Sequence, residues 1–150
     1  MNTMQRDRQT GVTLLEMLIV VVIVSILAAI IYPMYQDYVV RANRAVGKSV
    51  LLDVAARQEQ YFANNAGYSS GTVKLGYPTA YYVDRNGGQG TATTGIYLIS
   101  VTNATSAPIR DYTLTATRQN YQTRDTKCGN LTLNNLGVKS QTGTAARCWE

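Results

Sequence analysis

The sequence predicts an α+β protein in which one long N-terminal helix, membrane-spanning in its first half, packs on a small antiparallel sheet. Three features predict this fold: an apolar run close to the N-terminus, a helical apolar period that follows it, and short alternating segments in the second half of the chain. With 150 residues, the chain is long enough for one modest domain and too short for two ordinary ones.

The first predicted element is an apolar helix. After a polar segment at 1–11, every residue of 17–32 is apolar or aromatic except Ser25. As a helix, this run covers only ~24 Å, which is short of a hydrocarbon core of ~30 Å. Including 12–15 gives a helix that is long enough to span a membrane, and it places Glu16 inside the apolar region.

Three interpretations of this run compete. A secretory signal peptide would carry small residues at a cleavage site after the run, and Leu27-Ala28-Ala29-Ile30 has no such pattern. A plain membrane anchor leaves the carboxylate of Glu16 in lipid, at a cost of about 3 kcal/mol. A protonated Glu16 near the headgroups lowers that cost, but it does not explain the small residue Gly11 ahead of the span. The acid therefore indicates a functional site.

A motif at the start of the run accounts for both residues. Gly11-Val12-Thr13-Leu14-Leu15-Glu16, followed by Met17-Leu18-Ile19-Val20, resembles the leader-peptidase motif of the type IV pilin superfamily. The resemblance implies cleavage after Gly11, methylation of the new N-terminal residue Val12, and Glu16 as the fifth mature residue. The family usually begins with Phe, where this chain has Val12.

The resemblance continues along the helix. Pro33 matches the helix-kinking proline of the family, and Tyr35 and Tyr38 match its aromatic neighbours. The family often has Gly eight residues before this proline, where this chain has Ser25. The expected organisation is a cleaved leader at 1–11, a transmembrane and assembly helix at 12–33, and a head at 34–150.

The resemblance also suggests what Glu16 does. Cleavage would create an α-amine at Val12, four residues away on the same helix face. In a bundle of such helices, Glu16 of one subunit would pair with the amine of its neighbour. At ~4 Å and an effective dielectric constant of about 20, such a pair attracts by ~4 kcal/mol before desolvation is subtracted. We expect this assembly salt bridge to select the correct register between subunits.

Beyond Pro33 the sequence still predicts helix, because apolar residues recur on one broad face: Val46, Val50, Leu51, Val54, Ala55, Tyr61 and Phe62. The sequence Asn64-Asn65-Ala66-Gly67 predicts the end of this helix. The apolar face is too wide for solvent, so we expect a sheet to cover it.

Three segments predict that sheet. Residues 96–102 and 112–117 are rich in β-branched and aromatic side chains, and 130–134 alternates as Asn-Leu-Thr-Leu-Asn. Asn135-Leu136-Gly137 predicts a turn into a further short strand.

A long irregular connection is expected between helix and sheet, at 65–95. Within it, 85–90 predicts a mobile loop, and Tyr81-Tyr82 indicates either a partner contact or a sheet edge.

Charge and cysteine content exclude several functions. The net charge is +5, but the fourteen Lys and Arg residues are scattered, which is typical of a solvated surface. The chain has no His and two cysteines, too few for a structural zinc site, and we expect no metal or cofactor. Cys128 and Cys148 indicate a disulfide that closes a loop of about twenty residues, worth ~3 kcal/mol, with two unrelated buried thiols as the alternative.

Positive charges do not settle the membrane topology. Arg6 and Arg8 precede the span, whereas Arg41, Arg44 and Lys48 follow it. A disulfide forms outside the cytoplasm, which predicts a cytoplasmic N-terminus and a periplasmic or extracellular head.

The C-terminal region also resembles the pilins. A C-terminal disulfide defines their D-region, and Cys128 and Cys148 match its position; 122–133, with Cys148-Trp149, resembles PilE-type minor pilins. The resemblance implies a structural minor pilin of a type IV pilus, serving twitching motility, adhesion or DNA uptake. It implies an inner-membrane, single-pass form before assembly and a surface filament afterwards. The implied partners are major and minor pilin subunits, prepilin peptidase and methylase, and the inner-membrane assembly machinery.

Other functions stay open at this point. A type II secretion pseudopilin shares the N-terminal motif but commonly uses a calcium loop in place of the disulfide, and a major pilin fits the same N-terminal third. A membrane-tethered enzyme needs an oriented base or nucleophile, and we find no candidate catalytic residue. A basic patch for direct nucleic-acid binding is the less expected explanation for four cations: Arg110, Arg118, Arg124 and Lys127.

Overall fold

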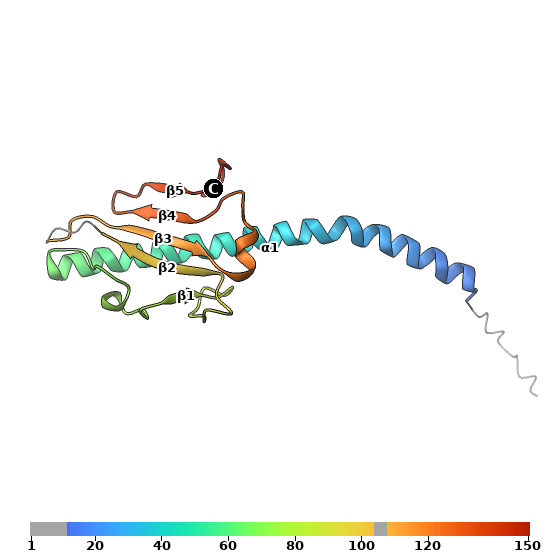
Figure 1. Cartoon of the computed structure of the whole chain (residues 1–150), viewed down its shortest axis with the longest axis horizontal. Helices are drawn as coiled ribbons and strands as arrows, with labels where there is room; N and C mark the ends of the chain where they lie inside the picture. The colour runs from blue at the N-terminus through green and yellow to red at the C-terminus, as the bar shows by residue number, and fades with distance from the viewer. Residues whose placement is uncertain (1–11, 104–107) are drawn as a thin grey trace, which may run out of the picture. The chain divides into compact units, whose positions relative to one another are not determined.

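The computed structural model describes residues 12–103 and 108–150. Its contacts divide the chain into two compact units, with the boundary between Tyr38 and Val39. We call 12–38 the stem and 39–150 the head. Helix α1 (Leu14–Asn65) begins in the stem and ends in the head (Figure 1).

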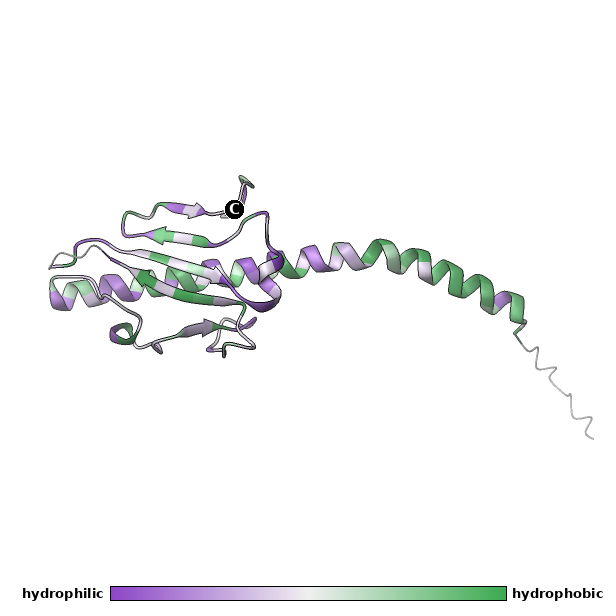
Figure 2. Ribbon diagram, in the orientation of Figure 1, coloured by the Kyte–Doolittle hydropathy of each residue, from purple (hydrophilic) through white to green (hydrophobic). Residues whose placement is uncertain are grey.

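The stem is a helix with an exposed apolar surface. Figure 2 shows the first half of α1 as an almost continuous hydrophobic ribbon. Its large apolar side chains are about half exposed or more, up to 84% at Leu14. By length and composition, this part of α1 is able to cross a membrane. A continuous apolar surface of this size requires lipid or other protein around it.

Pro33 lies inside α1, and the helix continues on both sides of it. The helix ends at Asn65, where the backbone N–H of Ala66 donates to the carbonyl of Phe62 at 2.9 Å. Ala66 has a φ of 53°, so the left-handed residue that closes the helix is this alanine. The predicted stop is confirmed, and the predicted kink at Pro33 stays a prediction.

The described part of the head contains one antiparallel sheet whose strands follow one another in chain order (Figure 1). Cα partners such as Ile99 with Ala116, and Ala116 with Leu131, define its register. Two short 3₁₀ helices, η1 (Val73–Leu75) and η2 (Asn120–Arg124), lie in the connections. The strands are β1 (Tyr81–Val83), β2 (Tyr97–Thr102), β3 (Thr113–Arg118), β4 (Leu131–Asn134) and β5 (Lys139–Gln141).

The structure confirms the three predicted strands as β2, β3 and β4, and the strand after the predicted turn as β5. β1 was not predicted, because three residues are too few to show alternation. It contains Tyr81 and Tyr82, and it pairs with β2 at the margin of the sheet. Of the two interpretations of these tyrosines, the sheet edge is therefore the one that the structure shows.

The core of the head lies between the sheet and the helix, with Leu51 and Val54 of α1 fully buried. The two layers approach closely at Gly47, where a Cβ atom would lie 2.7 Å from Cε2 of Tyr97. Tyr97 is itself fully buried, so its ring has little room to yield. Gly47 therefore sets how closely β2 packs on the helix.

At both margins of the sheet, another part of the chain is bonded to the outermost strand. At β1, the chain turns back so that Gly90 N–H donates to the Tyr82 carbonyl at 2.8 Å. At β5, the indole Nε1–H of Trp149 donates to the carbonyl of Ser140 at 2.9 Å. Lys139 lies over the same indole, 5.7 Å from its centre. The C-terminal segment thus packs against β5.

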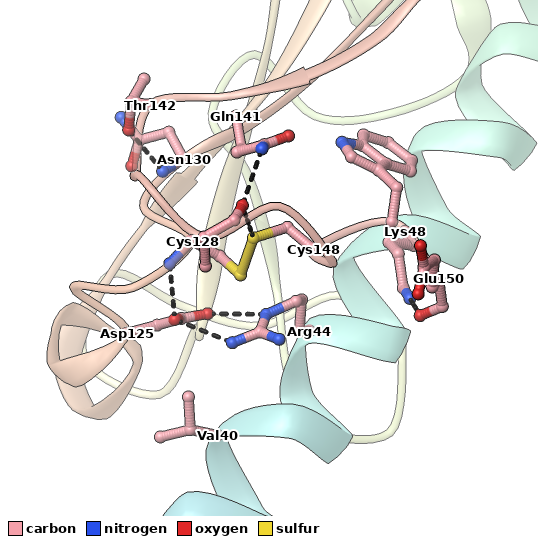
Figure 3. Close-up of a disulfide and its surroundings, with 12 residues drawn as sticks. Val40, Arg44, Lys48, Asp125, Cys128, Asn130, Gln141, Thr142, Cys148 and Glu150 are labelled. Carbon is pink, nitrogen blue, oxygen red and sulfur yellow. Dashed lines mark hydrogen bonds and ion pairs between the residues drawn. A yellow bond between two sulfur atoms is a disulfide. The ribbon is translucent and has the colours of Figure 1, made fainter.

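A disulfide fixes that segment. Cys128 and Cys148 are bonded, with Cα atoms 5.6 Å apart and both side chains buried, as the sequence predicts (Figure 3). The Ala145 N–H donates to the Lys127 carbonyl at 3.0 Å, and Gln141 Nε2 donates to the Ala145 carbonyl at 2.9 Å. Backbone bonds and the covalent bridge therefore hold the same loop.

A buried ion pair ties this loop to the helix. Arg44 of α1 donates from Nε and Nη2 to the two carboxylate oxygens of Asp125, at 2.9 Å each (Figure 3). The Asp125 side chain is 1% exposed and that of Arg44 is 13% exposed. Asp125 also accepts the backbone N–H of Cys128 at 3.1 Å and Nε2 of Gln122 at 3.3 Å. One carboxylate thus connects α1, η2 and the disulfide loop.

Gln122 extends this network into the core. Its Nε2 donates to the Val40 carbonyl at 3.2 Å and to the Tyr97 hydroxyl at 3.0 Å. Burial is the main cause that raises the pKa of Tyr97, and the nearby Asp125 carboxylate adds to it. The phenol therefore stays neutral across the physiological range.

Substitution of Arg44 by Met should destabilise the head by roughly 3–5 kcal/mol, because it leaves the Asp125 carboxylate buried without a cation. The Arg44→Met/Asp125→Leu double variant should recover much of this loss. Thermal unfolding of the full chain in neutral detergent, followed by near-UV circular dichroism, measures the effect.

The matched control is Arg147→Met, which removes an ion pair to Glu150 whose side chains are 85% and 71% exposed. Such a pair contributes little to stability. Equal melting temperatures for the Arg44→Met and Arg147→Met variants would show that the buried pair does not hold the loop on the helix.

Candidate functional site

The first turn of the stem combines a helix cap with an acid. The side-chain oxygen of Thr13 accepts the backbone N–H of Glu16 at 3.2 Å, and its carbonyl accepts the N–H of Met17 at the same distance. Thr13 and Glu16 have the spacing of a capping box, in which the first residue caps the helix and the acid lies in its first turn. An acid in this position is also favoured by the positive end of the helix dipole.

Glu16 is the one charged residue in the sequence from 12 to 36. The other polar groups within the apolar stretch are accommodated locally: the hydroxyl of Ser25 donates to the Val21 carbonyl at 2.7 Å. No comparable arrangement satisfies a carboxylate in an apolar environment, where an unpaired charge is expensive. Glu16 is therefore the residue of the stem that most needs a partner.

The partner predicted from the sequence is the α-amine of residue 12 in a neighbouring subunit. The structure places Val12 at the start of the described chain, and Gly11 lies outside the described residues. The cleavage after Gly11, the methylation of Val12 and the salt bridge of Glu16 therefore remain predictions.

The head does not gather the four cations that the sequence analysis grouped. Arg110 precedes β3 and Arg118 is the last residue of this strand, whose six residues span about 20 Å. Arg118 is held inside the fold, since its Nη1 donates to the carbonyls of Asp125 at 2.6 Å and Thr123 at 3.3 Å. The hypothesis of one patch built from Arg110, Arg118, Arg124 and Lys127 is therefore wrong.

A different grouping appears instead. Arg85, in the turn after β1, and Arg124, in η2, both lie against the ring of Tyr121. This cluster was not predicted from the sequence because Arg85 lies 36 residues before Tyr121 in the chain. The sequence places Arg85 in a glycine-rich loop, and that pattern predicts mobility but not a contact with Tyr121.

A second basic group lies by the C-terminal segment. Lys48 donates from Nζ to the backbone oxygen of Glu150 at 2.8 Å (Figure 3). Arg147 pairs with the Glu150 side chain. Burial is the main cause that lowers the pKa of Lys48, with further contributions from Arg44 and Lys139. The acid Glu150 thus offsets part of the positive charge here.

Among the described residues, no three His, Cys, Asp or Glu side chains lie close enough together to share a metal ion. The donor set of this part of the chain therefore offers no metal centre to add to the two features above, the acid in the stem and the arginines on Tyr121.

Comparison with known families agrees with the motif at the N-terminus and extends it. A prokaryotic N-terminal methylation motif matches residues 6–32. The family described as "Type IV minor pilin ComP, DNA uptake sequence receptor" matches residues 33–132. Together the two matches cover the chain from the polar N-terminal segment to β4.

Individual relatives match over about half of the chain. A fimbrial protein of Neisseria meningitidis serogroup B is 37% identical over 82 residues, which are 53% of this chain and 45% of that protein. The type II secretion system core protein G of Pseudomonas aeruginosa is 39% identical over 67 residues, 45% of this chain and 47% of that protein. The chain thus spans less than half the length of these curated relatives.

A solved type IV pilin from Shewanella oneidensis is 22% identical, with a TM-score of 0.49, over 74% of this chain and 98% of that chain. The family assignment does not depend on it, because the ComP family match alone covers two thirds of the sequence, including α1 beyond Pro33, β1, β2 and β3. The chain is a member of the type IV minor pilin family.

Proposed function

We propose that this protein is a structural subunit of a type IV pilus, which enters the filament through its stem. The observation that carries the proposal is an exposed apolar helix with a single acid in its first turn. Lipid would cover the apolar surface equally well, but the hydrocarbon of a membrane offers no partner for a carboxylate. A bundle of identical or related stems provides both an apolar environment and a cation.

Processing follows from the same motif. The methylation motif at residues 6–32 supports cleavage after Gly11 by a prepilin peptidase and methylation of Val12. The disulfide between Cys128 and Cys148 supports a head outside the cytoplasm and an N-terminus inside it. In this proposal the subunit waits in the inner membrane, and the assembly machinery transfers it into a surface filament beside major and minor pilins.

A pilus is favoured over a secretion system. The type II secretion protein matches over fewer than half of the residues, whereas the minor pilin family matches most of the head. Membership in this family also favours a structural role over an enzymatic one.

The processed N-terminus should be methylated Val12. Intact-mass and peptide mass spectrometry of the protein from its native cells should find residues 1–11 absent and one methyl group on the α-amine of Val12. Native protein that keeps 1–11 would contradict the proposed entry into a filament, since the charged amine would then be missing from the stem.

Replacing Glu16 by Leu should remove the protein from filaments while leaving it in the membrane, because the apolar stem is kept and the charge partner is lost. Comparison of sheared filaments with membranes on immunoblots measures the split. Replacing Ser25 by Ala is the matched control, since its hydroxyl bonds within its own helix. Wild-type levels of Glu16→Leu protein in filaments would contradict the salt-bridge role.

We also propose a second function, binding of DNA by the head. The family that matches 33–132 is described as a DNA uptake sequence receptor, which is the specific observation in its favour. The formal net charge of +5 supports attraction of a polyanion. A minor pilin with such a head would carry DNA contacts on the surface of the filament.

The full chain in neutral detergent should bind duplex DNA with an affinity that falls as salt rises, because phosphate contacts release counterions. Selection from a pool of random duplexes should enrich one common sequence, as a sequence receptor requires. Binding without any enrichment would reject a sequence receptor, and no binding at low salt would reject the second function altogether. Neither result touches the role of the stem.

A further inference from the structure

Two arginines share one tyrosine ring on the surface of the head. Cζ of Arg85 lies 5.2 Å from the ring centre of Tyr121, and Cζ of Arg124 lies 5.0 Å from it. Both distances are within the range of cation–π attraction. Both arginines are exposed and the tyrosine is half-buried, so the guanidinium groups are presented to solvent on a ring that is anchored in the fold.

The anchor of this ring is η2. Asn120 donates from Nδ2 to the carbonyls of Ala92 at 2.9 Å and Gly95 at 2.8 Å, which ties η2 to the connection between β1 and β2. Asn120 has a φ of 46°, a conformation that asparagine tolerates better than most residues. Gln122, on the other side of Tyr121, is completely buried in the network around Asp125. The backbone on both sides of the ring is therefore held.

The turn that carries Arg85 is also ordered by hydrogen bonds. The carboxylate oxygen Oδ1 of Asp84 accepts the backbone N–H groups of Asn86 at 2.8 Å and Gly88 at 3.0 Å. Asp84, the acid next to Arg85 in the sequence, thus accepts hydrogen bonds within its own turn. The loop predicted as mobile is a defined turn in this structure.

The charge environment separates this cluster from the other basic group of the head. Glu150 lies against Lys48 and Arg147 near the C-terminus, and Asp125 neutralises Arg44. Arg85 has no ion pair with any carboxylate in the described ranges 12–103 and 108–150, and its partner is the neutral ring of Tyr121. A guanidinium held this way keeps its planar donor fork available for an oxyanion.

We infer that Arg85 and Arg124, oriented by Tyr121, contact the phosphate backbone of DNA. The inference rests on the proposed DNA binding and adds the residues and the kind of contact. Phosphate contacts position a duplex but carry no sequence information, so the preference for a sequence must come from other residues. In this scheme Tyr121 is a positioning residue, and the two arginines are the contacts.

The test uses the full chain in neutral detergent and two fluorescent duplexes of equal length, one the sequence enriched by selection and one of unrelated sequence. The Arg85→Gln/Arg124→Gln variant should bind both duplexes at least about tenfold more weakly, by the same factor. Its slope of log affinity against log salt should be shallower by about 1.8, which is 0.9 for each lost phosphate contact.

The control is Lys139→Gln/Arg147→Gln, which removes the same charge beside Trp149 and should leave the salt slope almost unchanged. Tyr121→Phe, which keeps an aromatic face for both arginines, should bind as the parent does, whereas Tyr121→Leu should lose affinity on both duplexes. Near-UV circular dichroism verifies that each variant is folded.

Failure of the parent chain to bind either duplex would reject the proposed DNA binding itself. If the parent binds, an arginine variant that keeps the parental affinity and salt slope would overturn the inference alone. A loss confined to the selected duplex would also overturn it, because the arginines would then read bases.

Discussion

One helix has to bury two different apolar surfaces, and the organisation of this protein follows from that constraint. In the head, α1 packs against its own sheet, and Gly47 lets Tyr97 come close enough to close the core. In the stem, the same helix carries apolar residues that nothing in the described chain covers. The head is thus complete within one chain, whereas the stem depends on a membrane or on other subunits.

The sequence was informative where a pattern repeats. The apolar run and the helical period predicted α1 to within a few residues, and alternation predicted β2, β3 and β4. Sequence patterns did not predict contacts between residues that are far apart in the chain. β1 is too short to show a pattern, and Arg44 meets Asp125 across 81 residues. Arg85 meets Tyr121 where Asn120 ties η2 to the connection between β1 and β2.

The candidate site was predictable in part for the same reason. The acid of the stem can be singled out in the sequence because Glu16 is the one charged residue of an apolar run, whereas its salt bridge stays a prediction. The arrangement of surface cations depends on the tertiary fold, and scattered charges in a sequence do not reveal it. Arg118 illustrates the point. The sequence does not distinguish it from Arg124, but in the fold its guanidinium donates to backbone carbonyls.

The bond from the indole of Trp149 to β5 has a consequence for the filament proposed above. An exposed edge strand can pair with the same strand of another copy, and in the proposed filament the heads would lie at high local concentration. Trp149, bonded to the Ser140 carbonyl and held by the disulfide, keeps the chain's own tail against β5, the strand at this margin of the sheet. In such a filament, a neighbouring head that approached this margin would meet a fixed tail as well as β5.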